Sequence, residues 1–291
     1  MSIKNKEIGG RLVRLFSSST FRSLSSPTAP TVMRSIVAES GATGLGRRMR
    51  LRLLFDQAYD RLMDSYRSEY FYKNAIVNQI LLQKHTLDGG ARSARLLTEF
   101  WAGEARVDIG IVNGTSTAYE IKTELDTLDR LSNQLHWYSK VFDRVYVVVA
   151  NKNWPSIAKV LPRHVGLITM SPDGRLLERL GAASNKANID LRVLFRAMRE
   201  MEVLDICHRR FGVDYATPNG LRLDECWRVF KTLDHEEAHD LMVEVLRRRA
   251  IHPAQSALIE SAPSSLKVHA IGMVMNVRQY RMALNQLDAV A

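Results

Sequence analysis

The strongest constraint on the fold is a pair of short apolar segments, joined by a turn, that carry three charged residues. The first segment contains Asp108, and the second contains Glu120 and Lys122. Asn113-Gly114 lies between them and is typical of a tight turn, so the segments are predicted to form a β-hairpin. Burying an ion is costly unless it is paired or bound to a metal. Three charges on strands this apolar therefore indicate a functional site.

The length of the hairpin loop decides whether the charges meet. Residues two apart on a strand face the same side, so Glu120 and Lys122 share a face. A two-residue loop would pair Val112 with Thr115 and place Asp108 and Glu120 on opposite faces. A three-residue loop or a bulge places Asp108 opposite Glu120. We predict this second register, because two carboxylates and an ammonium on one face can hold a divalent cation and orient a water.

The pattern around the hairpin predicts an α/β fold, in which a mixed central sheet is flanked by helices. Arg144–Ala150 is a continuous apolar run, as expected of a central strand covered on both faces. Further strands are expected at 95–101, 106–112, 117–123 and 165–170, with a short edge strand after the turn at 171–174. Helices are expected from Arg47 to Leu81, ending before Asp88-Gly89-Gly90, and at 127–142, 189–207, 223–233, 236–249 and 266–287. Asp126 is expected to cap the helix at 127–142.

Three regions follow from this reading. Residues 1–46 are expected to be a basic, irregular leader, residues 47–184 the domain with the sheet, and residues 185–291 a helical C-terminal region. The formal net charge is +10, and residues 1–61 hold 11 Lys and Arg against 4 Asp and Glu. A phosphate-backbone partner is the natural interpretation of such a surplus, with Arg47, Arg48 and Arg50 as contacts.

The charged residues are arranged as in a known family. Glu69 in a helical segment, Asp108 on a strand, Glu120-Ile121-Lys122 on the next strand and Gln134 on the following helix occur in that order. This order resembles the PD-(D/E)xK nuclease superfamily. The segment Glu124–Leu131, followed by Gln134, Tyr138 and Val141–Val149, is similar to an uncharacterised bacterial branch of it. Val107 stands at the position of the motif's proline, which many members lack.

The resemblance implies a restriction-endonuclease-like core and Mg²⁺-dependent (or Mn²⁺-dependent) hydrolysis of DNA, with RNA not excluded. Asp108, Glu120 and the Ile121 carbonyl would bind the metal. Lys122 would activate the attacking water, and Glu69 and Gln134 would complete the catalytic cluster. Arg130, one turn before Gln134, could contact a phosphate.

Two alternatives remain open at the level of sequence. One is a catalytically inactive nucleic-acid-binding module or regulator with the same fold. The other is a zinc protease, because His235-Glu236-Glu237-Ala238-His239 matches His-Glu-x-x-His and Glu260 could be a third ligand. The charges around that motif favour a solvated helix start instead.

The composition also bears on location. Cys207 and Cys226 are the two cysteines and form no Cys-x-x-Cys pair, which favours a reducing compartment. No apolar run is long enough for a membrane span, so a bacterial cytoplasmic protein is expected. The pattern does not predict the oligomeric state.

Overall fold

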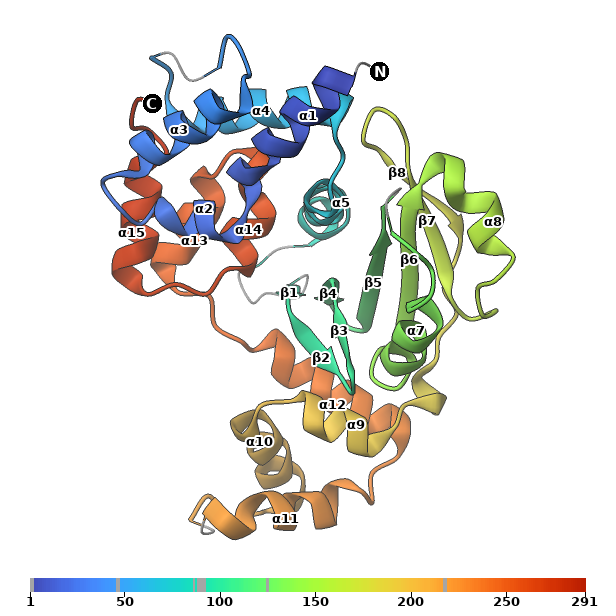
Figure 1. The fold of residues 1–291 in the computed structure, drawn as a ribbon. Helices are drawn as coiled ribbons and strands as arrows, with labels where there is room; N and C mark the ends of the chain where they lie inside the picture. The colour runs from blue at the N-terminus through green and yellow to red at the C-terminus, as the bar shows by residue number, and fades with distance from the viewer. Residues whose placement is uncertain (1–2, 46–47, 86, 88–92, 124–125, 217–218) are drawn as a thin grey trace. The chain divides into compact units, whose positions relative to one another are not determined.

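The computed structural model describes residues 3–45, 48–85, 87, 93–123, 126–216 and 219–291 (Figure 1). The expected class is confirmed, because the chain has a six-stranded mixed sheet flanked by helices and a helical C-terminal region. The predicted end of the helical region at Asp88-Gly89-Gly90 lies outside the described residues. None of the helices in the described part of the chain combines the length and apolar character that crossing a membrane requires.

Contacts divide the chain into two compact units. One comprises the described parts of Met1–Gln83, Pro172–Arg175 and Ala250–Ala291, and the other those of Lys84–Ser171 and Leu176–Arg249. We call them the helical unit and the sheet unit. The expected C-terminal region, 185–291, is thus shared between the two units, and residues up to Gln83 group with the chain's last helices.

The sheet unit is built on strands in the order β1-β4-β5-β6-β7-β8. Strands β5, β6 and β7 are parallel, and the other pairings are antiparallel. As predicted, β6 is central and apolar, and all but its first residue is buried. Strands β2 and β3 form a separate hairpin. The strands are β1 Arg95–Leu97, β2 Phe100–Ala102, β3 Ala105–Val107, β4 Ile109–Val112, β5 Ser116–Lys122, β6 Arg144–Ala150, β7 Gly166–Met170 and β8 Leu176–Leu180.

The register prediction for the β4–β5 hairpin is confirmed. Ile109 pairs with Tyr119 and Val112 pairs with Ser116, which leaves a three-residue loop at 113–115. Gly114 has φ +113°, a conformation that favours glycine. Asp108 directly precedes β4, so the same register continues to place it opposite Glu120.

In the described part of the sheet unit, helices α7, α8, α9 and α12 pack on the strands, and α10 and α11 pack on other helices. Helix α7 contacts β3 and β6, α9 contacts β2, and α12 contacts β4. Their buried residues join the strands in one core. The helices are α7 Leu131–Ser139, α8 Trp154–Ala158, α9 Leu191–Ala197, α10 Glu200–Phe211, α11 Asn219–Phe230 and α12 His235–Arg247, with short 3₁₀ turns at Asn151–Asn153 and Lys186–Asn188.

Two expected helices of this unit are different in the structure. Asp126 does not cap α7, because its carboxylate accepts hydrogen bonds from the backbone N–H and hydroxyl of Thr123, and α7 begins only at Leu131. The helix expected at 189–207 is broken into α9 and α10. The Glu202 carboxylate accepts a hydrogen bond from the Arg199 backbone N–H at 2.9 Å, which starts a new helix.

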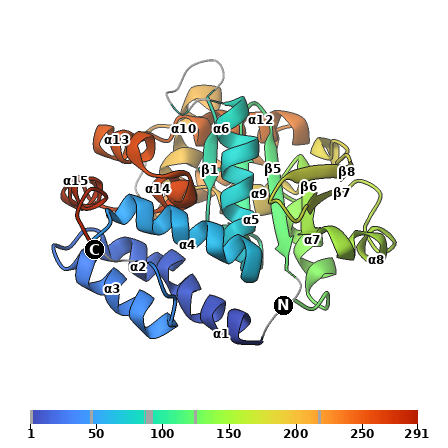
Figure 2. The same cartoon turned by 90° about the horizontal axis from the view of Figure 1, so that it is seen from above.

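The helical unit contains the N-terminal residues, which are not irregular in their described part. Leu12, Leu15 and Phe16 are buried, and Ser17 caps α2 by accepting a hydrogen bond from the Thr20 N–H. Helices α1 to α4 lie side by side (Figure 2). The expectation of an irregular leader was therefore wrong. The segment is rich in serine, but it also contains enough apolar residues to form short helices that bury them. These elements are α1 Ile3–Leu12, a 3₁₀ turn Val13–Phe16, α2 Ser18–Ser23, α3 Ala29–Ser40, α4 Leu51–Ser65, α5 Glu69–Ile76, a π-helical turn Val77–Leu81 and α6 Leu82–Lys84, which ends at the boundary of the unit.

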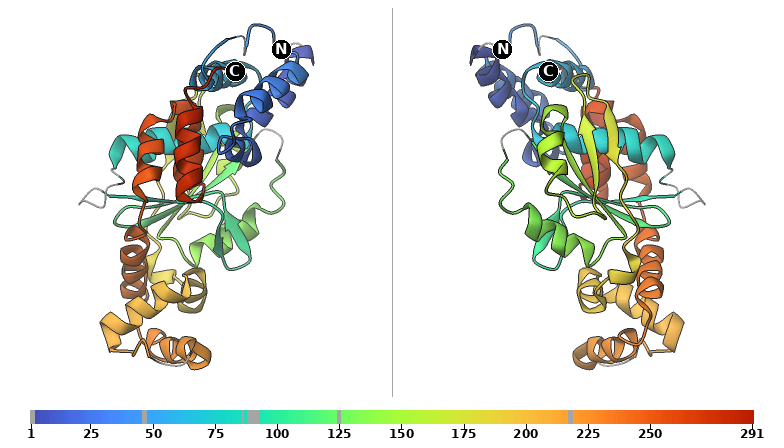
Figure 3. Two further views of the ribbon diagram at one scale, coloured as in Figure 1. Left: turned by 90° about the vertical axis from the view of Figure 1, so that its left-hand side faces the viewer. Right: turned by 90° about the vertical axis from the view of Figure 1, so that its right-hand side faces the viewer.

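The last helices complete this unit, and they lie together in Figure 3. The helix expected at 266–287 is interrupted between Gly272 and Val277, where Asn276 caps a new helix by accepting a hydrogen bond from the Gln279 N–H. The elements are α13 Pro253–Ser261, a 3₁₀ turn Ser264–Leu266, α14 Lys267–Gly272 and α15 Val277–Gln286.

Candidate active site

The hairpin brings two carboxylates to one place in the sheet unit. Asp108 lies between β3 and β4, is partly exposed, and its Oδ2 accepts a hydrogen bond from the Ile121 backbone N–H at 2.9 Å. Glu120 lies on the neighbouring strand β5 and is only 1% exposed. The two residues therefore approach each other across the strand pair, as the three-residue loop requires.

The buried Glu120 carboxylate is compensated on both of its oxygens. Lys122 Nζ lies 2.8 Å from Oε1, and the Tyr138 hydroxyl lies 2.7 Å from Oε2. Lys122 itself is 6% exposed. A buried carboxylate is stable only with such partners, so the ion pair and the tyrosine hold Glu120 in one orientation.

Helix α7 contributes the remaining polar groups. Gln134 Oε1 accepts a hydrogen bond from Lys122 Nζ at 2.8 Å, so the ammonium is fixed between Glu120 and Gln134. The structure thus brings together four of the predicted catalytic residues: Asp108, Glu120, Lys122 and Gln134.

Tyr138 is a member of this cluster that the sequence pattern did not identify. Tyr138 lies in the segment that is similar to the bacterial branch, but the resemblance implied no role for it. Burial, followed by the negative charges of Glu120 and Asp108 and the hydrogen bond to Glu120, raises the pKa of Tyr138 far above its usual value. The phenol therefore stays protonated and donates to the carboxylate. Its position one helical turn after Gln134 was the signal in the sequence.

A pocket of about 530 Å³ opens beside Asp108, which lines it together with Gln134, and we call it the site pocket. Glu120 and Lys122 are buried behind this wall. Arg130 is exposed on its wall at the start of α7, and its guanidinium has no hydrogen bond or ion pair among the described residues. An unpaired arginine in the same pocket wall as Asp108 is suited to hold an anionic group of a substrate. The pocket is lined by Trp101, Glu104, Ala105, Arg106, Asp108, Arg130, Asn133 and Gln134.

The donor set fits a hard divalent cation. Asp108, Glu120 and Lys122 together carry one net negative charge, so an added cation would be attracted. No group of three or more His, Cys, Asp or Glu able to hold a metal is gathered in the described ranges. Mg²⁺ commonly binds through one or two carboxylates and completes its shell with water and substrate phosphate, which this pair can offer.

Several predicted residues lie elsewhere. Glu69 begins α5 in the helical unit, where its half-exposed carboxylate pairs with Lys73 Nζ at 2.5 Å. Arg48 is exposed, and the exposed Arg50 pairs with Asp288 at 3.7 Å. Arg47 lies outside the described residues. Their proposed roles stay predictions.

The His-Glu-x-x-His segment forms the start of α12. Asp234 caps this helix by accepting hydrogen bonds from the N–H groups of Glu236 and Glu237, as expected for a solvated acidic helix start. His235 Nδ1 lies 2.5 Å from the Ile189 carbonyl and donates to it. Glu260 belongs to the helical unit. His239 is fully buried, so the segment presents no open pair of histidines.

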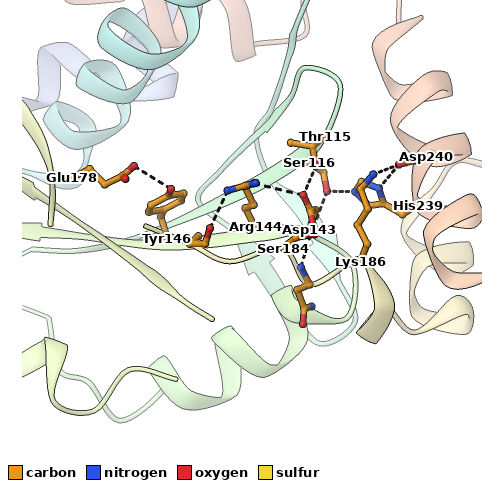
Figure 4. Close-up of polar contacts among 12 residues, drawn as sticks. Thr115, Ser116, Asp143, Arg144, Tyr146, Glu178, Ser184, Lys186, His239 and Asp240 are labelled. Carbon is orange, nitrogen blue, oxygen red and sulfur yellow. Dashed lines mark hydrogen bonds and ion pairs between the residues drawn. The ribbon is translucent and has the colours of Figure 1, made fainter. Parts of the chain in front are cut away.

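His239 belongs to a buried polar network (Figure 4). Its Nε2 lies 2.8 Å from Ser116 Oγ and its Nδ1 lies 2.9 Å from Asp240 Oδ1. This is the connectivity of a Ser-His-Asp triad. Both Ser116 and His239 are 0% exposed, so a substrate cannot reach the hydroxyl. The network instead joins α12 to β5.

Asp143 continues that network at the start of β6. The Asp143 backbone N–H donates to Ser116 Oγ, and its carboxylate accepts from the hydroxyls of Thr115 and Ser184. Burial raises the pKa of Asp143, but these hydrogen bonds, with one from the Asn185 N–H, hold it below the usual value. The carboxylate therefore anchors the loop of the β4–β5 hairpin.

Comparisons with known proteins point to one family. The family model described as "Bacteriophage P4 protein cII" matches residues 63–269. Protein cII of Enterobacteria phage P4 is 36% identical over 63 residues, which are 22% of this chain and 24% of that protein. The chain thus matches about a quarter of the length of that curated relative. A solved protein of unknown function from Silicibacter pomeroyi has 17% identity and a TM-score of 0.31, over 50% of this chain and 92% of that one.

Proposed function

The chain belongs to the bacteriophage P4 protein cII family, and we propose that it is a metal-dependent nuclease that hydrolyses DNA phosphodiester bonds. The observation that carries this proposal is the cluster of Asp108, Glu120 and Lys122 on paired strands, of which Asp108 lines an open pocket. A purely structural ion pair needs neither the second carboxylate nor the pocket. The arrangement also agrees with the resemblance to PD-(D/E)xK nucleases.

The chemistry assigns a task to each side chain. Lys122 is held by Glu120 and Gln134, so its ammonium would orient the attacking water and stabilise charge on the phosphoryl oxygens. Arg130, unpaired on the pocket wall, would hold the phosphate. Tyr138 keeps Glu120 in place and does not itself reach the pocket.

Asp108 and Glu120 would bind the cation, with the Ile121 carbonyl as the third protein ligand that the resemblance implies. Bound Mg²⁺ or Mn²⁺ would supply Lewis-acid stabilisation of the phosphate charge and a more acidic water. Protonation of either carboxylate would weaken this site.

The test uses the purified full chain with linear, circular and branched DNA, with Mg²⁺, with Mn²⁺ and with EDTA. We expect cleavage that EDTA abolishes and that Asp108→Asn reduces by about 10²–10³-fold, the range for losing one electrostatic group of an active site. Asp224→Asn changes an exposed aspartate outside the pocket and should cleave normally. Cleavage that is equal in EDTA would contradict the proposal, as would the absence of cleavage on every substrate.

One observation favours a second function. Both Glu120 oxygens already have partners, so the cluster is closed by its own side chains. An inactive nucleic-acid-binding protein with the same fold would keep such a pair for stability. Calorimetric titration with Mn²⁺ separates the two: the nuclease predicts binding that Asp108→Asn removes, and the inactive protein predicts none.

A further inference from the structure

A second pocket, of about 430 Å³, adjoins the site pocket in the sheet unit. The two pockets share Trp101 and Glu104 in their walls. We call the second one the flanking pocket. Its wall also contains Trp137 on α7, Lys140 just after that helix, and Arg192 and Arg196 on α9.

Trp101 is unusual because its large apolar side chain is 57% exposed. It lies on β2 of the β2–β3 hairpin, at the boundary between the two pockets. Its indole N–H has no hydrogen-bond partner among the described residues. An exposed tryptophan in the wall of a pocket that also contains charged side chains is suited to stack on a flat ligand.

The second aromatic wall is held rigidly. Gly103 turns the β2–β3 hairpin with φ +60°, and a Cβ atom placed there would lie 2.0 Å from the Trp137 ring. The hairpin backbone therefore lies directly on the Trp137 ring. Lys140 Nζ lies 4.5 Å from the centre of the same ring, on the pocket side of the helix. Trp137 is thus fixed before any ligand arrives.

Cations dominate the rest of the wall. Arg196 is exposed and has no hydrogen bond or ion pair among the described residues, and Arg192 stacks over Trp227 at 4.6 Å. Of the two acids in the pocket, Asp190 is occupied in capping α9, where it accepts from the N–H groups of Arg192 and Val193. Lys140, Arg192 and Arg196 therefore outnumber the acids and leave an excess of positive charge.

We propose that the flanking pocket binds an unpaired nucleotide next to the scissile phosphate, so that the substrate is a nucleic acid with a single-stranded segment. A base would stack on Trp101, and Arg192 and Arg196 would hold the adjoining phosphates. Exposed aromatic rings in a basic groove are how proteins bind single strands, because only an unpaired base offers its face. The position next to a scissile phosphate rests on the proposed function. The binding of an unpaired nucleotide is argued from the residues of the flanking pocket alone.

The test is fluorescence anisotropy in EDTA, so that no cleavage occurs, with a labelled single-stranded DNA oligonucleotide and the same sequence as a blunt duplex. Wild type should bind the single strand more tightly than the duplex. Trp101→Ala should weaken single-strand binding about 10-fold or more, within the range measured for losing one base stack, and Trp101→Phe should retain most of it. Arg196→Ala should weaken single-strand binding and reduce the slope of log affinity against log salt by about one, as expected for the loss of one phosphate contact.

Two control variants are matched to these changes. Val160→Ala alters an exposed apolar residue, and Arg163→Ala an exposed arginine; both lie outside the two pockets and should bind as wild type does. Equal affinity for duplex and single strand, or a folded Trp101→Ala protein with unchanged affinity, would overturn the inference.

The outcomes separate this inference from the proposed function. Loss of single-strand binding in Trp101→Ala supports the flanking pocket even if wild type cleaves nothing. Cleavage that depends on Asp108, together with unchanged binding by Trp101→Ala, supports the nuclease and overturns the flanking pocket.

Discussion

Lys122 Nζ is held by two acceptors, Glu120 Oε1 and Gln134 Oε1, each at 2.8 Å. Since Lys122 would act on the attacking water and would not bind the metal, substituting it tests the cleavage step separately from metal binding. Lys122→Met keeps both carboxylates and leaves the Tyr138 bond to Glu120 intact. We expect kcat to fall by about 10²–10⁴-fold while Mn²⁺ still binds, as when one acid–base or electrostatic group is lost.

The measurement pairs single-turnover cleavage with calorimetric Mn²⁺ titration. Lys159→Met, which changes an exposed lysine outside the pockets, serves as the control and should match wild type in both. A Lys122→Met protein that cleaves at the wild-type rate would remove Lys122 from the mechanism.

A second prediction at this scale concerns His269 in the helical unit. The pKa of His269 is lowered to about 4, mainly by burial and also by the positive charge of Lys73. The hydrogen bond from His269 to the Phe16 carbonyl acts in the opposite direction and raises the pKa. Because the unfolded chain binds this proton at higher pH than the folded chain does, stability is complete above pH ~6.5 and is lost as the pH falls towards 4. The loss from this residue is about 3 kcal/mol.

Urea unfolding at pH 7 and at pH 4.5 measures this effect. His269→Gln should flatten the dependence on pH, whereas His136→Gln, at an exposed position, should leave it unchanged. Part of the dependence should survive in His269→Gln, because burial also lowers the pKa of His239 in the sheet unit. An identical dependence on pH in wild type and His269→Gln would refute this assignment.

The predicted strand residues that the structure brings together are those whose charge conflicts with an apolar strand. Asp108, Glu120 and Lys122 were visible because a charge between buried apolar residues needs a partner. Tyr138 was not visible, because a tyrosine in an apolar helical stripe fits the core equally well. Only the approach of α7 to β5 shows that its hydroxyl faces Glu120.

Among the elements, the β2–β3 hairpin offers the sharpest test. Gly103→Ala forces φ +60° on a residue with a side chain and places its Cβ against the Trp137 ring. We expect a loss of at least ~1 kcal/mol in the free energy of unfolding, since both the backbone and the packing oppose the change. Urea unfolding with Gly220→Ala as the control checks this, because that exposed helical glycine has nothing within 4 Å of an added Cβ. Equal stability of the two variants would show that the hairpin does not lie on Trp137 as described.

Two features of the strands were predictable, although the strands expected at 95–101 and 106–112 are each divided in two. The apolar run at Arg144–Ala150 and the need to bring two carboxylates together were enough to predict β6 and the three-residue loop. Helix ends depended on single side-chain bonds, such as Asp126 to Thr123 and Glu202 to the Arg199 N–H, which compete with helix continuation. The periodicity of apolar residues does not reveal whether a polar side chain will bond to the backbone nearby and end a helix, or leave the helix to continue.

At the scale of the whole molecule, the net charge of +10 predicts binding to nucleic acid that weakens with salt. Residues 3–40 are folded, so deleting them would expose the apolar residues they bury, and charge substitutions are the better probe. Replacing Arg48 and Arg50 by alanine should reduce the slope of log affinity against log salt by up to ~2 if both contact phosphates. Arg163→Ala with Arg175→Ala removes the same charge from exposed positions and is the control. A slope equal to that of the control would exclude both arginines from the interface.

The division into units shows what the sequence pattern could not supply. A boundary at residue 184 follows from the change to helical periodicity, but the contacts group residues 250–291 with the N-terminal helices. Contacts between distant segments, such as Tyr70 with the Ser265 carbonyl, leave no local signal in the sequence. Glu69 is in that unit, whereas Asp108, Glu120, Lys122 and Gln134 are in the sheet unit.

The most direct measurement of the central claim is the rate of Mg²⁺-dependent DNA cleavage by Glu120→Gln, compared with Glu236→Gln. The first variant keeps the size of the buried side chain but removes its charge, and the second neutralises an exposed glutamate of the His-Glu-x-x-His segment. The proposed nuclease predicts that wild type and Glu236→Gln cleave equally, while the cleavage rate of Glu120→Gln falls by about 10²–10³-fold. Full activity of a folded Glu120→Gln protein would contradict the account.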